Sequence, residues 1–181
     1  RKAVHNRRMG IRYYAYAFDG DMTQQAIDNP DSIVSDDPLA DAWGFTPGAT
    51  GLLDATFERR LPESDFLYLD KAWRGLQKVT GPANDRVLPR PAFRMFEGDV
   101  NWGPFGHDRW VRIVPPREVV TIAADLAALS EEEIRAKSDG SDFLHQSADE
   151  EAEYMMRSIR IATNFVQGLV KTGRGFIYLI R

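Results

Sequence analysis

The stretch FLYLDKAWRGLQKVTG, from Phe66 to Gly81, decides the fold because it combines a strand, a helix start and a helix stop. Phe66 to Leu69 is short, apolar and aromatic, as the end of a buried strand is. Asp70 is expected to cap a helix beginning at Lys71, since its carboxylate can accept hydrogen bonds from the first backbone N–H groups. Gly81, followed by proline, is expected to end that helix. The stretch therefore predicts a strand that leads directly into a helix.

The rest of the chain shows the same mixture of strand and helix patterns. The aromatic run IRYYAYAF and the closing run FIYLI are typical of strands, and the spacing of Val119, Ile122 and Leu126 is typical of a helix. Ser130 and Glu133 match a capping box at the start of the next helix. Strands are expected at 11–18, 66–69, 92–96, 110–114 and 176–180, and helices at 22–29, 52–60, 71–80, 116–129, 131–137 and 149–171.

These elements predict the class α+β, as a single compact domain. We expect a mixed or mostly antiparallel sheet packed by about four to five helices. The chain has 181 residues, 43% of them hydrophobic, and no linker or internal repeat divides it. We place the domain at residues 9–181, with Met9 as the natural start, and read residues 1–8 as a flexible basic tail.

The charge distribution argues against a nucleic-acid surface. The formal net charge is −4, yet residues 1–8 hold four of the 23 basic side chains and no acidic one. The remainder of the chain therefore has 19 basic residues against 27 acidic ones, a net charge of −8. A protein that binds nucleic acid needs clustered Lys and Arg to release counterions from the phosphates. Nucleic acid is accordingly an unlikely partner.

The absence of cysteine excludes disulfides, thiolate nucleophiles and zinc sites built on Cys pairs. The three histidines are far apart and match no metal-binding spacing, so we expect no metal and no cofactor. No apolar run is long enough to span a membrane, and the N-terminus lacks the apolar core of a secretory signal. A cytoplasmic protein without membrane contact is the expectation.

At LDKAWRGLQKVTG, Leu69 to Gly81, the chain resembles the YfbM-like family, which is also known as domain of unknown function family 1877. The opening MGIRYYAYAF, the segment GPFGHDRWVRIVPPREV, the following ADLAALSEEEIRAK and the last helix with its closing strand agree with it. The resemblance covers most of 9–181, apart from 31–62 and 138–147. It implies a compact α+β domain and no established activity.

The chain departs from the family pattern on the helix after Asp70. Where relatives often carry histidine after the tryptophan and again three residues later, this chain has Arg74 and Gln77. Histidine chemistry on this helix is therefore not available here.

The segment His107-Asp108-Arg109 is the candidate catalytic site. His107 can transfer protons near neutral pH, Asp108 can orient the imidazole, and Arg109 can hold an anionic group. The alternative is a turn in which Asp108 bonds its own backbone and Arg109 pairs with a surface acid.

A ligand or partner surface is expected at Trp73, Arg74, Trp102 and Arg109, because arginine and exposed aromatic rings are typical of binding sites. The alternative for Trp73 is a place in the core. Two functions follow from these residues. The first is a small protein-binding or accessory module without catalytic activity, as a monomer or weak homodimer with an unidentified protein partner. The second is an enzyme for a small anionic substrate, with His107 as general acid/base in a pocket walled by Trp73 and Trp102.

Overall fold

The middle of the fold is a four-stranded antiparallel sheet in the order β2-β1-β6-β5. The computed structural model describes residues 10–45, 55–84, 86–100, 102–103, 106–141 and 147–181. The strands of this sheet are β1 (Tyr13–Phe18), β2 (Phe66–Asp70), β5 (Trp110–Val114) and β6 (Gly175–Ile180). A separate short ribbon pairs β3 (Trp102–Gly103) with β4 (Gly106–His107).

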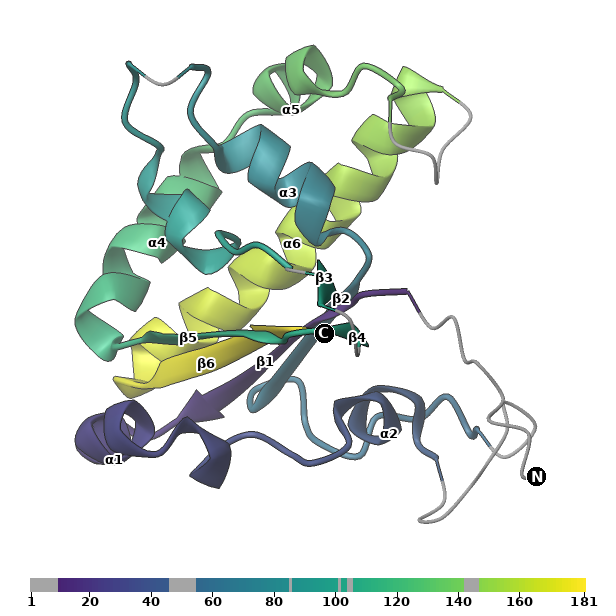
Figure 1. Cartoon of the computed structure of the whole chain (residues 1–181). Helices are drawn as coiled ribbons and strands as arrows, with labels where there is room; N and C mark the ends of the chain where they lie inside the picture. The colour runs from purple at the N-terminus through teal and green to yellow at the C-terminus, as the bar shows by residue number, and fades with distance from the viewer. Residues whose placement is uncertain (1–9, 46–54, 85, 101, 104–105, 142–146) are drawn as a thin grey trace, which may run out of the picture.

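Helices cover both faces of the sheet (Figure 1). One face carries α3 (Trp73–Thr80), α4 (Pro116–Ala128), α5 (Glu131–Lys137) and α6 (Ala148–Thr172), together with the 3-10 helix η4 (Pro91–Met95). The other face carries α1 (Thr23–Asp28) and α2 (Pro38–Trp43), with the 3-10 helices η1 (Gly20–Met22) and η2 (Pro30–Ser32) beside α1. The described part of the chain thus forms an α+β fold in three layers, with six α-helices where four to five were expected.

Side chains of each strand alternate between the two faces because the strand period is two residues. Tyr13 and Ala15 join the larger core under α3 to α6, whereas Tyr14 and Tyr16 face α2. β6 is buried on both faces, since it lies between two strands and between two helical layers. Its residues Phe176, Tyr178 and Ile180 pack on the α6 side, and Ile177 and Leu179 on the other.

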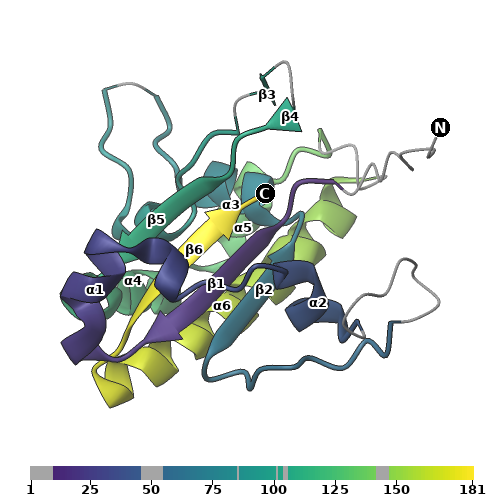
Figure 2. The ribbon, with the colours of Figure 1, turned by 60° about the horizontal axis from the view of Figure 1, so that its bottom comes forward.

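The pairing of β1 with β6 brings the first and last strands of the chain together at the centre of the sheet (Figure 2). Just beyond the strand ends, the Arg12 backbone N–H donates to the Arg181 carbonyl at 2.7 Å, and the Arg181 N–H donates back at 3.0 Å. On the other side of β6, Trp110 pairs with Ile180, so the preceding residue, Arg109, stands next to Arg181. Three arginines thereby meet at one end of three neighbouring strands.

α5 begins with the capping box that its sequence predicts, and α6 has a cap at each end. Ser130 accepts a hydrogen bond from the Glu133 N–H at 3.2 Å, and the Glu133 carboxylate accepts one from the Ser130 N–H at 2.8 Å, which completes the predicted capping box of α5. Ser147 caps α6, and Gly173 closes it in the left-handed conformation at φ +65°.

Asp70 does not cap a helix, contrary to the expectation. α3 begins at Trp73 and its N-cap residue Ala72 makes no side-chain hydrogen bond. Asp70 instead ends β2 with a left-handed backbone, φ +48°, and its carboxylate binds Arg12 and the Tyr68 hydroxyl. The Asp70 carboxylate is therefore bound to Arg12 and Tyr68 and does not cap α3.

Two other expected elements differ. The expected strand at 92–96 is wrong: Pro91–Met95 forms η4, whose apolar residues pack under α4. A 3-10 helix fits because Pro91 sets the first turn and Asp125 on α4 accepts a hydrogen bond from the Ala92 N–H at 2.8 Å. The expected helix at 52–60 is absent over the described residues 55–60, while 52–54 lies outside them.

α2, which was not expected, begins after Asp37, whose side chain accepts a hydrogen bond from the Ala40 N–H at 3.1 Å. The tail at residues 1–8 and Met9 also lie outside the described residues.

Candidate functional site

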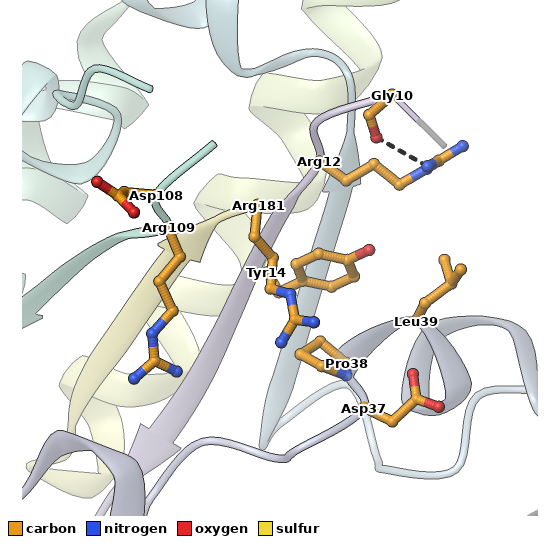
Figure 3. A pocket seen from close by; sticks show the side chains of 9 residues that line it. All are labelled: Gly10, Arg12, Tyr14, Asp37, Pro38, Leu39, Asp108, Arg109 and Arg181. Atoms are coloured by element: carbon orange, nitrogen blue, oxygen red, sulfur yellow. Dashed lines mark hydrogen bonds between the residues drawn. The ribbon is translucent and has the colours of Figure 1, made fainter. Parts of the chain in front are cut away.

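A pocket of about 530 Å³ opens at the edge of the sheet where β1 and β5 begin and β6 ends, beside the start of α2 (Figure 3). Its arginine side chains come from three neighbouring strands, and we call it the three-arginine pocket. Its lining residues are Gly10, Arg12, Tyr14, Asp37, Pro38, Leu39, Asp108, Arg109 and Arg181.

Arg12 is held rigidly at one side of the pocket. Its Nε lies 2.7 Å from Oδ1 of Asp70, in an ion pair whose N–H is not aligned for a hydrogen bond. One terminal nitrogen donates to the Gly10 carbonyl at 2.8 Å, and the guanidinium lies 5.1 Å from the centre of the Trp43 ring. The Arg12 side chain is only 10% exposed, so its charge is compensated inside the protein by Asp70.

Arg109 and Arg181 differ in their charge compensation. Arg109 forms an ion pair with Asp31 of η2. Arg181 is exposed and forms no ion pair with any residue of the described chain. In Figure 3 its side chain extends into the pocket between Arg109 on one side and Leu39 on the other. Arg181 is therefore the cation of this pocket that is available to a ligand.

Tyr14 presents a hydroxyl without a partner in the three-arginine pocket. The residue is only 4% exposed, and its ring stacks on Tyr68 with 5.3 Å between ring centres. Over the described residues, its hydroxyl makes no hydrogen bond. Burial raises the pKa of Tyr14 to about 12, although the positive charges of Arg12 and Arg181 act to lower it. The phenol is therefore protonated at neutral pH and can donate a hydrogen bond.

The wall opposite the arginines is partly apolar. Pro38 and Leu39 are both buried at the first turn of α2, and Asp37 ahead of them is occupied as the cap of that helix. In Figure 3 the carboxylate of Asp108 points away from Arg181. The pocket thus offers a guanidinium, a phenol and an apolar wall to one ligand.

The structure places the candidate catalytic residues as follows. Asp108 and Arg109 line the three-arginine pocket. His107 belongs to β4, but its side chain lies outside the described residues. Arg109 has a surface acid, Asp31, as its partner, which is the pairing expected for the turn.

Of the residues expected on a ligand surface, Arg109 lines this pocket, Trp73 lies in the core and Arg74 is exposed. Trp73 is 5% exposed, packs in the core and donates from Nε1 to the Ile11 carbonyl at 3.2 Å. Arg74 covers the Trp73 ring at 5.0 Å. Neither is among the residues that line the three-arginine pocket. Trp102 belongs to β3, and its side chain lies outside the described residues.

Sequence reasoning missed Arg12, Tyr14 and Arg181. The available signal was the placement of an arginine directly before the first expected strand and another directly after the last one. Only the pairing of these two strands, which are separated by nearly the whole chain, makes that placement a site.

The described ranges contain neither a cluster of metal ligands nor a membrane-spanning helix. No group of three or more His, Cys, Asp or Glu residues there could hold a metal ion. None of the helices described is long and apolar enough to cross a membrane. A smaller hollow of about 340 Å³ lies between α6, the start of β2 and residues 59–64.

Comparison with known proteins gives one informative match. No family model matches the sequence, and no curated protein matches it. A search of solved structures finds the crystal structure of YfbM from Escherichia coli, a protein of unknown function. The TM-score is 0.56 at 15% sequence identity, and the match covers 94% of this chain and 99% of YfbM. The chain has the fold of YfbM.

The match with YfbM confirms the YfbM-like fold that the sequence resemblance predicted. Because the match extends over nearly all of both chains, the fold is shared as a whole. At 15% identity, the likeness to YfbM shows the fold alone.

Proposed function

We propose that this protein is a binding module that holds an anionic group of its ligand in the three-arginine pocket. The observation that carries the proposal is Arg181, whose guanidinium extends into the pocket and has no carboxylate partner over the described residues. A guanidinium binds carboxylate or phosphate oxygens through two parallel hydrogen bonds. Arg181 supplies that group at a concave surface.

The size and rigidity of the pocket support the same function. Its volume of about 530 Å³ lies within the range of roughly 300–1,000 Å³ that is usual for small-molecule sites. Arg12 is fixed by Asp70 and Trp43, so this wall is formed before a ligand arrives. A preformed site loses less conformational entropy on binding.

The negative net charge of the chain does not oppose local binding of an anion. At physiological ionic strength, charges more than about 8 Å apart in solvent are largely screened from each other. The interaction with a bound anion is then governed by the groups that line the pocket.

An acidic group of a protein partner can use the same pocket, so the proposal includes protein binding as well as small-molecule binding. A protein partner and a cytoplasmic setting are parts of the proposal; a chain without cysteine suits a reducing compartment. The proposal assigns binding to Arg181 and no bond-making step to His107.

Calorimetric titration with acetate, hexanoate and inorganic phosphate at physiological ionic strength tests this function. The wild-type protein is expected to bind at least one of these anions with a stoichiometry of one. Arg181→Gln should weaken that binding by roughly 10-fold or more, because a charge-assisted hydrogen bond pair is lost. Arg160→Gln is the matched control, since Arg160 is an exposed arginine on α6 outside the pocket.

Two results would contradict the proposed function. One is the absence of binding for all three anions. The other is an equal loss of affinity in Arg181→Gln and Arg160→Gln, which would show that the anions associate with the surface nonspecifically.

A further inference from the structure

The charges around the three-arginine pocket limit the charge of its ligand. Arg12 is compensated by Asp70 and Arg109 by Asp31, which leaves Arg181 as the one uncompensated cation among the described lining residues. Asp37 and Asp108 add two carboxylates to the lining. A ligand with two or more negative charges would meet those carboxylates with only one free guanidinium in return. The charge balance favours a single negative charge.

The Tyr14 hydroxyl adds a second requirement. It is held in a residue that is only 4% exposed, and it lacks a hydrogen-bond partner over the described residues. The phenol lines the pocket and can donate this hydrogen bond to an acceptor atom of a ligand. In Figure 3 the hydroxyl points to the side on which Arg12 and Leu39 lie, while Arg181 lies beside the ring. Both the hydroxyl and Arg181 line the pocket, so each can donate to an oxygen of a bound ligand.

The apolar wall gives the third requirement. Pro38 and Leu39 are buried against the body of the protein but line the pocket with their remaining surface. Inorganic anions such as phosphate have no apolar surface to place there. At neutral pH inorganic phosphate is a mixture of monoanion and dianion, and the Asp37 and Asp108 carboxylates oppose the dianion.

From these three features we infer that the ligand of the three-arginine pocket is an organic monocarboxylate with an apolar body. Its carboxylate bonds to Arg181 and Tyr14, and its apolar body lies on Pro38 and Leu39. The inference rests on the proposed function, since it names the class of anion that the same pocket takes. An acidic side chain or a carboxyl terminus beside apolar residues of a protein has the same chemistry.

The test compares hexanoate, hexanedioate and inorganic phosphate on the intact chain by calorimetry. Hexanoate is expected to bind at least 10-fold more tightly than either of the others. Tyr14→Phe should weaken the affinity for hexanoate by roughly 10-fold or more, the usual effect of removing a hydrogen bond to a charged group. Tyr154→Phe, on α6 and outside the pocket, is the control and should leave affinity unchanged.

A loss of hexanoate affinity in Tyr14→Phe is not expected to come from unfolding of the variant. Tyr14→Phe removes a hydroxyl that has no partner over the described residues and keeps the ring that stacks on Tyr68, so its circular dichroism and melting temperature should match the wild type.

The outcomes separate the two proposals. If no anion binds the wild type, the proposed function and this inference both fail. If phosphate or hexanedioate binds as well as hexanoate and depends on Arg181, anion binding stands and the monocarboxylate class is overturned. If hexanoate binds but Tyr14→Phe leaves its affinity unchanged, the assigned role of Tyr14 is overturned.

Discussion

Replacing Asp70 tests whether the ion pair behind the three-arginine pocket holds β1 and β2 together. The Asp70 carboxylate lies 2.7 Å from Nε of Arg12 and accepts a hydrogen bond from the Tyr68 hydroxyl at 2.9 Å. Asp70→Asn keeps the size of the side chain but removes its charge. Arg12, with a side chain 10% exposed, would then lack its counter-charge.

The size of the effect follows from burial. Removing one partner of a fully buried ion pair costs about 3–5 kcal/mol, and exposed pairs contribute about 1 kcal/mol or less. Because the Asp70 side chain is 41% exposed, Asp70→Asn should lower the free energy of unfolding by about 1–3 kcal/mol.

A second substitution separates the charge from the backbone conformation. Asp70 has φ +48°, a conformation that Asn adopts more readily than Ala. Asp70→Ala should therefore lower the free energy of unfolding by about 1 kcal/mol more than Asp70→Asn does. Urea unfolding at neutral pH measures both differences in the free energy of unfolding, with one value for its dependence on urea concentration used for all variants. Glu63→Gln, in the exposed Arg59–Glu63 pair, is the control and should change little.

An Asp70→Asn variant as stable as the wild type would show that Arg12 does not depend on this carboxylate. An Asp70→Ala variant no less stable than Asp70→Asn would show that the left-handed backbone at this position costs alanine nothing.

Further predictions concern helix glycines, a helix cap and the tyrosines. Gly168→Ala should raise the free energy of unfolding by about 0.5–1 kcal/mol, since an added Cβ meets nothing within 4 Å and alanine favours the helix. Gly75→Ala should instead lower it by about 1 kcal/mol, because the added Cβ would lie 2.3 Å from Sδ of Met155; urea midpoints that move in the same direction for both variants would contradict this contrast. Ser130→Ala should lower the urea midpoint by removing the side-chain half of the α5 capping box, and an unchanged midpoint would show that the cap contributes nothing to global stability. Burial raises the pKa of five of the six tyrosines, that of Tyr14 to about 12, so the unfolded chain loses these protons at lower pH than the folded one and stability should fall as pH rises from about 10 to 12. Phenolate absorbance at 295 nm should show at most one ionised tyrosine in the folded protein at pH 11, and ionisation of several before unfolding would contradict the burial.

Much of the helical half of the fold could be predicted from the sequence because its signals are local. The apolar stripe of α4 and the capping box of α5 each specify an element without reference to the rest of the chain. Residues 91–95 could not be assigned in this way, because a short apolar run fits a strand and a buried 3-10 helix equally well. The contact with Asp125 decides between them.

The site was only partly predictable for a related reason. Asp108 and Arg109 stood out because they follow a histidine, and both line the pocket. Arg12 and Arg181 carry no local motif, and their proximity depends on the pairing of β1 with β6. Asp70 was assigned to a helix cap because the sequence cannot show that Arg12 lies within 2.7 Å of its carboxylate.

Nuclear magnetic resonance of the arginine Nε–Hε groups during a hexanoate titration shows which guanidinium contacts the anion. Binding in the three-arginine pocket predicts a saturable shift of the Arg181 signal, with Arg157 and Arg160 on the exposed side of α6 unchanged. An unchanged Arg181 signal at saturating hexanoate, or equal shifts of Arg157 and Arg160, would contradict the claim.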